Sequence, residues 1–301
     1  MPARLHLVAA GIGRFNAHSR SAPLSLKYAA SDAKRLVRQL KKQLGAGLQV
    51  YGGRALTDRT ATRLTLLEQI DAAIEAAAGH PDDLVLIYLR SLGLVHDDGV
   101  YLLSTDFDPS DPWGSSVSQS DLEALMARHD ARVVLVLETD KPASPVAAAR
   151  PEKGTQKGSL ALAPALTSSQ TPPLRMSAVT AAVTAAPGQD RVRLLEPLAW
   201  GRQNTWVLLS SRGDRSLEGP RFCKGAGAFA CLLLEGLSGR ADIPESGEID
   251  ADNLITVEEL AGFLERRLPD LVRQAGLEPS QVPAMLKYGG ALTVGRRPLP
   301  R

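Results

Sequence analysis

Continuous apolar runs alternate with helical apolar stripes along the first half of the chain. Leu5–Ala10 is a short apolar run that ends at Gly11, which is typical of a buried strand followed by a loop. Ala33–Leu44 carries apolar residues three and four positions apart with basic residues between them, which predicts an amphipathic helix. The pattern then repeats, with a strand predicted over Leu48–Leu56 and a helix over Thr60–Ala78.

Two further runs contain no polar position. Leu84–Leu89 and Val133–Leu137 are continuous apolar segments, which predicts strands buried on both faces of a parallel sheet. Asp98–Gly99 indicates a β-hairpin after the first of them, and Ser120 with Glu123 forms a capping box that would open a helix before the second. This repetition predicts an α/β fold, a three-layer α/β/α sandwich around a mostly parallel sheet of about six strands.

The composition changes in the middle of the chain. Residues 141–188 are rich in Ala, Pro, Ser and Thr and poor in large apolar residues, which predicts a flexible insert within a single domain of residues 1–301. Beyond the insert the pattern predicts a strand over Thr205–Leu209, helices over Phe229–Leu237 and Val257–Gln274, and a candidate closing strand over Ala291–Val294.

Charge narrows the expected partners. Lys and Arg number 35 against 33 Asp and Glu, a formal net charge of +2, and basic residues are interspersed with acidic ones along the chain. Nucleic acid is therefore not an expected partner.

The two cysteines and the lengths of the apolar runs indicate in which cellular compartment the protein is expected. Cys223 and Cys231 cannot build a disulfide framework and are expected to be packed thiols of one helix, which favours a reducing compartment. No segment has the core of a signal peptide or the roughly 18 apolar residues of a membrane span. We expect a cytoplasmic protein with no membrane partner.

Four stretches stand in an order that is also found in a known group of peptidases. They are Ala22–Ala33, Asp82–Leu94 with the following Val100–Leu103, Arg132–Asp140, and Gly225–Leu237. Together they resemble the caspase, metacaspase and bacterial orthocaspase superfamily over nearly the whole chain apart from the insert. The resemblance implies a caspase-like fold, a bacterial origin, and a site formed after the third and fourth strands.

The two positions of the family's catalytic dyad carry other residues here. Members of the family have Ser-Gly-His-Gly after the third strand, where this chain reads Arg90–Gly93, so that Leu92 replaces the histidine. They have Asp-Ala-Cys-His-Ser-Gly after the fourth strand, where this chain reads Glu138–Ala143, so that Asp140 replaces the cysteine. Leucine moves no proton and a carboxylate attacks an amide poorly, so we expect a pseudo-protease rather than an enzyme.

Such a protein is expected to act by binding. The expected partner is another protein, either an active caspase-like relative or a second copy of this chain in a homodimer. Candidate cleft residues lie where the strands end, the edge at which open α/β sheets bind ligands: Arg90, Ser91, Glu138, Thr139, Ser210, Ser211 and Arg212. An ion pair between Arg90 and Asp140 is expected to fill the former cleft.

Two alternatives remain open. A hydrolase with relocated chemistry could use Ser91 with His96 as its base, or Asp140, although His96 beside a predicted turn is more simply a solvated hairpin residue.

The second alternative concerns calcium. Glu248, Asp250, Asp252 and Glu259 have offsets similar to those of a calcium-binding loop, but Asn253 stands where that loop needs glycine, so the same residues could simply form an acidic helix N-terminus. No other cofactor is expected, because the glycines after the first apolar run lack the third glycine of a dinucleotide fingerprint.

Overall fold

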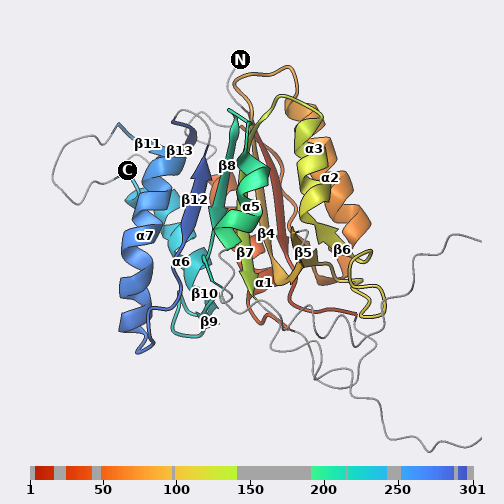
Figure 1. Cartoon of the computed structure of the whole chain (residues 1–301). Helices are drawn as coiled ribbons and strands as arrows, with labels where there is room; N and C mark the ends of the chain where they lie inside the picture. The colour runs from red at the N-terminus through yellow and green to blue at the C-terminus, as the bar shows by residue number, and fades with distance from the viewer. Residues whose placement is uncertain are drawn as a thin grey trace, which may run out of the picture.

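The molecule has three layers, with a central sheet covered by helices on both faces (Figure 1). The structure is a computed structural model, and it describes residues 4–16, 25–42, 49–96, 99–140, 191–213, 216–242, 252–287 and 291–296. The expected insert at residues 141–188 lies outside the described residues. Among the described helices, none combines the length and apolar character needed to cross a bilayer.

The main sheet has the strand order β12-β8-β7-β4-β1-β2. All neighbours in this order are parallel except β12, which runs antiparallel to β8. The strands in chain order are β1 (Arg4–Gly11), β2 (Gln49–Gly52), β4 (Leu84–His96), β7 (Arg132–Asp140), β8 (Thr205–Leu209) and β12 (Ala284–Lys287). The predicted α/β class and the sheet of about six mostly parallel strands are confirmed.

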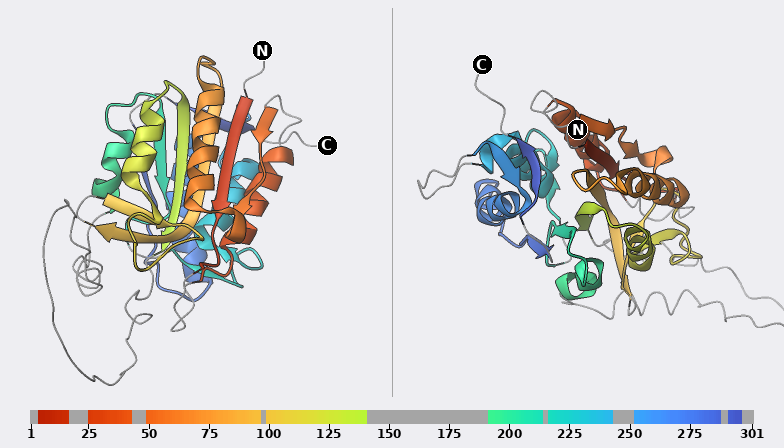
Figure 2. Two further views of the ribbon diagram at one scale, coloured as in Figure 1. Left: turned by 90° about the vertical axis from the view of Figure 1, so that its right-hand side faces the viewer. Right: turned by 90° about the horizontal axis from the view of Figure 1, so that it is seen from above.

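Alternate side chains of the buried strands enter two separate cores. Leu86 and Tyr88 of β4 pack in one core with α1 (Ala29–Lys42), α6 (Ala228–Glu235) and α7 (Val257–Gln274). Ile87 and Leu89 pack in the other core with α2 (Arg63–Ala77), α3 (Gln119–Ala127) and α5 (Arg191–Ala199). Figure 2 shows these two helical layers on opposite faces of the sheet. Burial on both faces explains why Leu84–Leu89 of β4 and Val133–Leu137 of β7 are apolar at every position.

Smaller elements extend the sheet at its carboxyl edge. β4 continues past the sheet and pairs antiparallel with β5 (Gly99–Leu103), which pairs with β6 (Ser116–Ser118), so the predicted hairpin is confirmed. The remaining short elements are β3 (Leu56–Thr57), η2 (Asp58–Thr60), β9 (Glu218–Gly219), β10 (Ala226–Gly227), η3 (Gly236–Arg240), β11 (Leu254–Thr256) and β13 (Thr293–Arg296).

Two local predictions are wrong. The capping box of α3 lies two residues earlier than expected, because the Ser118 hydroxyl accepts from the Asp121 amide at 3.0 Å and the Asp121 carboxylate accepts from the Ser118 amide at 2.9 Å. The expected closing strand near Ala291–Val294 forms β13, which pairs with β11 outside the main sheet, whereas β12 closes the main sheet. A four-residue strand carries too little pattern to show which neighbour it will pair with.

The cysteines form a disulfide and not two thiols. Cys223 is exposed in the turn between β9 and β10, Cys231 is buried in α6, and their Cα atoms are 5.6 Å apart. Cys223 and Lys224 both adopt positive φ angles, 44° and 61°, and so form the tight turn that carries one sulfur back to the helix. The disulfide contradicts the expectation of packed thiols and removes the basis for inferring a reducing compartment.

Candidate functional site

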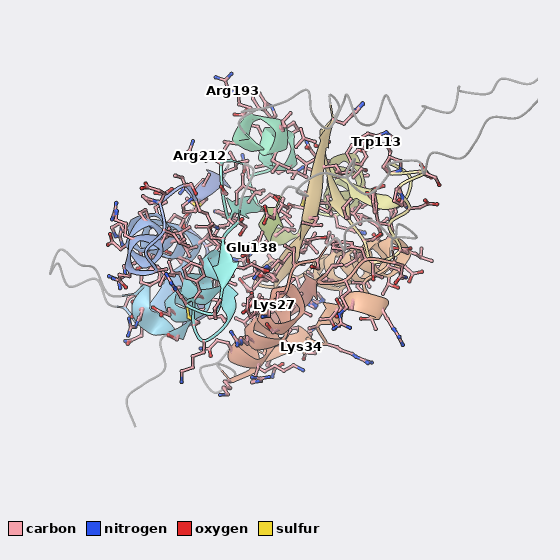
Figure 3. The ribbon with its side chains drawn as sticks, turned by 90° about the horizontal axis from the view of Figure 1, so that it is seen from below. Lys27, Lys34, Trp113, Glu138, Arg193 and Arg212 are labelled. Carbon is pink, nitrogen blue, oxygen red and sulfur yellow. A yellow bond between two sulfur atoms is a disulfide. The ribbon has the colours of Figure 1, made fainter. Side chains whose placement is uncertain are left out.

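The candidate cleft residues lie at the carboxyl edge of the sheet, which faces the viewer in Figure 3 with Glu138 near its centre. The parallel register of β4 and β7 places Arg90 beside Glu138 and Leu92 beside Asp140. Ser210 follows β8, and its amide donates to the carbonyl of Leu137 on the neighbouring β7 at 2.9 Å. The structure therefore brings the predicted residues of three strands to one edge.

Four charged side chains form a buried cluster beneath this edge. The guanidinium of Arg90, which is only 1% exposed, pairs with Asp32 from α1, with Glu138 at 3.5 Å, and with Glu218 from β9 at 2.7 Å. We refer to Arg90, Asp32, Glu138 and Glu218 as the charge cluster. The expected ion pair between Arg90 and Asp140 is wrong, because Glu138 lies directly opposite Arg90 and two carboxylates from distant segments complete its surroundings.

Neutral donors hold Glu138 in place. The Tyr88 hydroxyl donates to Glu138 Oε2 at 2.8 Å, and the Ser216 hydroxyl donates to Oε1 at 3.1 Å. Ser216 is oriented by Gln281, a fully buried residue whose amide nitrogen lies 3.2 Å from the serine oxygen and donates to the Ser210 carbonyl at 3.0 Å. Both carboxylate oxygens of Glu138 therefore accept a hydrogen bond from a buried neutral group, as burial requires.

Backbone amides hold the two carboxylates that come from outside the sheet. The Gly227 amide donates to Asp32 at 2.9 Å, and the amides of Lys27 and Tyr28 donate to Glu218 at 2.8 and 3.3 Å. Gly227 is required for close approach, since a Cβ atom there would lie 2.4 Å from both the guanidinium and a carboxylate oxygen of Glu138. The β9–β10 hairpin is thus built to close over the charge cluster.

The cluster carries more negative than positive charge. Burial raises the pKa of Asp32 to about 7, Glu138 contributes in the same direction, and the opposing attraction of Arg90 is too small to reverse the shift. Burial alone would lower the pKa of Arg90. Its four polar neighbours have the larger, opposite effect and raise this pKa, and they are Glu138, Tyr88, Asp32 and Glu218. The guanidinium therefore stays charged. Asp32 therefore titrates near neutrality while Arg90 does not.

The serines after β8 make structural contacts. Ser210 and Ser211 are buried, and the Ser211 hydroxyl accepts from the Gly213 amide at 3.2 Å. The Arg212 side chain is exposed, while its amide donates to the carbonyl of Val282 at 2.7 Å. These contacts fasten the end of β8 to the segment before β12.

Leu92 and Asp140 are the two positions that the resemblance aligns with the catalytic dyad of the family. Leu92 is 4% exposed and packs with Leu26, Ala29, Leu94, Leu103 and Phe107. Asp140 is half-buried and Thr139 is buried at the end of β7. Leu92 is thus a core side chain, and Asp140 ends the neighbouring strand.

Ser91 and His96 are not brought together. Ser91 is buried, and its hydroxyl donates to the Leu103 carbonyl at 2.5 Å. His96 lies five residues further along the extended strand, roughly 16 Å away at the usual rise, with its ring 4.7 Å from that of Trp113. A hydroxyl–imidazole pair from these two residues is therefore absent from this site.

The described part of the calcium-like loop is used for helix capping. Glu259 accepts from the amide and hydroxyl of Thr256 at 2.7 and 2.8 Å, which makes it the third residue of a capping box for α7. Asp252 accepts from the Leu254 amide at 2.8 Å, and Asn253 has a φ of 65°. Glu248 and Asp250 lie outside the described residues, so calcium binding stays a prediction.

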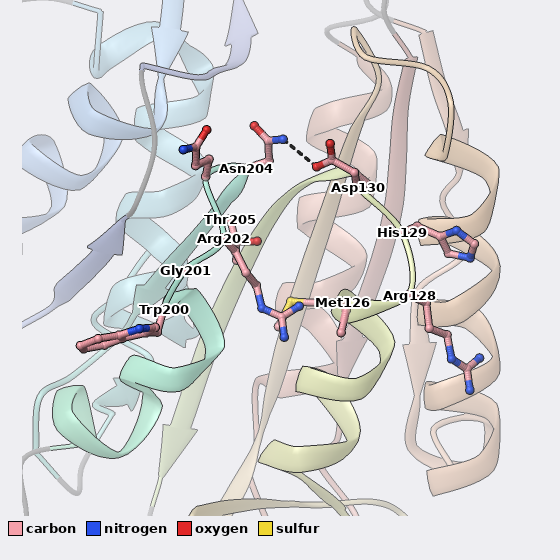
Figure 4. A pocket seen from close by; sticks show the side chains of 12 residues that line it. Met126, Arg128, His129, Asp130, Trp200, Gly201, Arg202, Asn204 and Thr205 are labelled. Atoms are coloured by element: carbon pink, nitrogen blue, oxygen red, sulfur yellow. Dashed lines mark hydrogen bonds between the residues drawn. The ribbon is translucent and has the colours of Figure 1, made fainter.

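A separate cavity of about 580 Å³ lies at the opposite end of the sheet, between the ends of α3 and α5 (Figure 4). Residues of Met126–Ala131 and Trp200–Thr205 line it. Asn204 donates to Asp130 at 2.9 Å, and Arg202 donates to the Glu123 carbonyl at 3.0 Å. These contacts join the two segments and bring no nucleophile and base together among the lining residues.

Sequence reasoning did not identify Asp32, Glu218 or Gln281 as parts of the site. Asp32 did carry a detectable signal, because it stands three residues after Ala29 and four before Leu36, on the apolar face of its helix. A charged residue on such a face needs a buried partner. Glu218 and Gln281 lie in segments without a periodic pattern and gave no comparable signal.

Comparisons with known proteins agree on the fold. No protein-family model and no curated protein matches the chain. Protein GSU0716 from Geobacter sulfurreducens has a similar solved structure, with a TM-score of 0.53 and 15% identity over 96% of this chain and 94% of that one. Caspase-1 from Spodoptera frugiperda gives a TM-score of 0.51 and 13% identity over 98% of this chain and 92% of that one.

The chain therefore has a caspase-like fold, an α/β/α sandwich whose carboxyl edge holds the buried charge cluster. At these identities the similarity shows the fold and nothing of the chemistry. Function has to be argued from the residues at the edge.

Proposed function

We propose that this protein is a caspase-like pseudo-protease that binds another protein and does not cleave peptides. The observation that carries the proposal is the pairing of Leu92 with Asp140 at the ends of β4 and β7. Peptide hydrolysis by nucleophilic catalysis needs an activated nucleophile and a neighbouring base within about 3 Å, and an alkyl side chain supplies neither.

The other histidines and cysteines of the described residues lie elsewhere, among them exposed His80 in the turn before β4. His6, at the opposite end of the sheet, lies 3.0 Å from the Asp83 carboxylate, and His129 lines the distant cavity. Cys223 and Cys231 are joined in the disulfide beside α6. In the part of the chain that the structure describes, no imidazole or thiolate therefore supports the former dyad positions.

The charge cluster also argues for binding over catalysis. The Arg90 side chain fills the space between the carboxylates of Asp32, Glu138 and Glu218, so this space is not open to a side chain of a substrate. Because the interior of the site is filled, the outer surface of the molecule is left to make contacts with a partner. The partner we propose is an active caspase-like relative or a second copy of this chain.

We predict that the purified chain will not cleave a positional-scanning peptide library above the buffer rate. It should also show no labelling by fluorophosphonate or acyloxymethyl ketone probes, because the site has no activated serine or cysteine. The Ser91→Ala and Asp140→Asn variants should be indistinguishable from the wild type. Turnover or labelling that either substitution abolishes would instead establish the hydrolase with relocated residues.

We further predict a specific protein complex. A tagged full-length chain should capture a partner that, after purification, binds the chain again with a Kd of about 10 µM or tighter, or else the chain should self-associate in sedimentation velocity runs. A second tagged chain that lacks residues 141–188 serves as the matched bait. It shows whether that segment makes the contact with the partner. A chain that stays monomeric and rebinds no purified partner would contradict the proposal.

A further inference from the structure

Positive charge is concentrated in the first part of the chain. Residues 1–57 contain ten lysines and arginines and a single acidic residue, Asp32, which gives +9. The whole chain carries +2, so the remainder carries −7. The even interspersion assumed from the overall composition is therefore wrong, and the fold decides where these charges reach the surface.

Half of these ten cations lie on one helix. The exposed and half-buried positions of α1 are Ala30, Ser31, Lys34, Arg35, Arg38, Gln39, Lys41 and Lys42. Five of these eight side chains are cationic, and none is acidic or a large apolar group. Asp32, the one acid of the helix, is buried in the charge cluster, and its carboxylate also lies 3.8 Å from the guanidinium of Arg35. It therefore offsets part of the charge of Arg35 alone among the five cations.

Neighbouring segments extend this cationic surface. Gly53 lies against Lys41, because a Cβ atom at Gly53 would be 2.7 Å from the Lys41 Cε atom. Arg54, the next residue, therefore flanks the carboxyl end of α1. Near the middle of α1, Arg35 donates to the Gly225 carbonyl at 2.8 Å, which places exposed Lys224 close to it. We refer to Lys34, Arg35, Arg38, Lys41, Lys42 and Arg54 as the basic face.

Two acidic residues that lie near the basic face in the described part of the chain are bound to other groups. Glu218 is bound by Arg90 and by two backbone amides, and Glu235, at the end of α6, pairs with Arg240 at 3.5 Å. Figure 3 shows Lys34 beside α1, far from Arg193 and Arg212 on the other side of the molecule. The basic face is thus a local excess of charge on one side of the fold.

We propose that the basic face binds the phosphate backbone of a nucleic acid without reading its sequence. Lys34, Arg38 and Lys41 form a row of about 10 Å along the helix, which matches about three phosphates of one strand. Nucleic-acid interfaces are far more cationic than protein interfaces, whose cores are apolar and depleted in lysine. The basic face has no apolar core of that kind, and the apolar side of α1 is buried, so it cannot insert into a bilayer.

The inference is independent of the proposed protein-binding function and is tested by fluorescence anisotropy. Labelled duplex DNA and labelled single-stranded RNA of mixed sequence should both bind, and log K should fall linearly with log salt between about 50 and 200 mM. The combined Lys34→Gln, Arg38→Gln and Lys41→Gln variant should bind about 10- to 100-fold more weakly, and its salt slope should be smaller by about 2 to 3.

A matched control removes the same charge elsewhere. The control variant combines Arg193→Gln in α5, Arg212→Gln after β8 and Arg273→Gln in α7, and all three arginines are exposed. This variant should keep the wild-type affinity for nucleic acid within about twofold. Circular dichroism checks that both variants remain folded. Equal weakening in both variants, no binding by the wild type, or tighter binding to polyglutamate or to phosphatidylserine vesicles than to either nucleic acid would overturn the proposal.

Discussion

Replacing Arg90 by alanine is expected to lower the free energy of unfolding by about 3–5 kcal/mol at neutral pH. The substitution leaves Asp32, Glu138 and Glu218 facing one another around a cavity, and two of the three side chains are almost wholly buried. Removing one partner of a buried ion pair costs far more than the pair contributes, because the remaining charge stays desolvated. Urea unfolding followed by tryptophan fluorescence would measure the loss.

Two variants make this expectation specific. Arg128→Ala removes an arginine that is 57% exposed and pairs with Asp71 at the surface, and it should cost less than about 1 kcal/mol. Arg90→Met combined with Asp32→Asn and Glu138→Gln removes the buried charges together and should recover most of the loss, and it also serves if Arg90→Ala does not fold. An Arg90→Ala variant within about 1 kcal/mol of the wild type would show that the charge cluster is not a stabilising unit.

The layers of the fold could be predicted because they depend on local pattern. Leu84–Leu89 and Val133–Leu137 are apolar at every position, and only a strand covered on both faces needs this. The glycine and proline positions around them also limit where each element can end. The carboxyl edge as the location of the candidate site followed from the same parallel order.

The interactions within the site could not be predicted because they join segments that are distant in sequence. Arg90 meets Asp32 across 58 positions and Glu218 across 128. The family resemblance placed Asp140 at the strand end, where β7 does end, but it could not show that Glu138, two residues earlier, would lie opposite Arg90. The register of two parallel strands decides that choice, and a shift of one residue would have turned both side chains to the other face.

The β9–β10 hairpin was the least predictable part. Its two strands contain two residues each, so no period can be detected, and its turn depends on positive φ angles at Cys223 and Lys224, which are not glycines. The disulfide holds this turn against α6. The hairpin that contains the turn places Glu218 and Gly227 at the charge cluster. Two cysteines eight positions apart gave no indication of this role from their spacing alone.

The wild type is expected to lose stability relative to an Asp32→Asn variant as the pH rises toward neutrality. In the unfolded chain Asp32 loses its proton near its ordinary pKa of 3.8, whereas in the folded protein burial holds its pKa at about 7. Between these values the folded state binds more protons than the unfolded state, so the free energy of unfolding falls with rising pH. The slope approaches about 1.4 kcal/mol per pH unit, and the total loss is about 4 kcal/mol.

Asparagine has nearly the same shape as aspartate and does not titrate, so the difference between the two proteins isolates this carboxyl group. Other groups cancel in the difference. One of them is Asp83, whose burial is outweighed by hydrogen bonds from His6 and the Arg4 amide, which lower its pKa and give the opposite pH trend. Urea unfolding of both proteins from about pH 5 to about pH 8 gives the free energy of unfolding of the wild type minus that of the variant. This difference should fall by roughly 2 kcal/mol up to pH 7 and then level. A difference that is flat or grows with pH would mean that Asp32 is ionised throughout and that Arg90 fully compensates its burial.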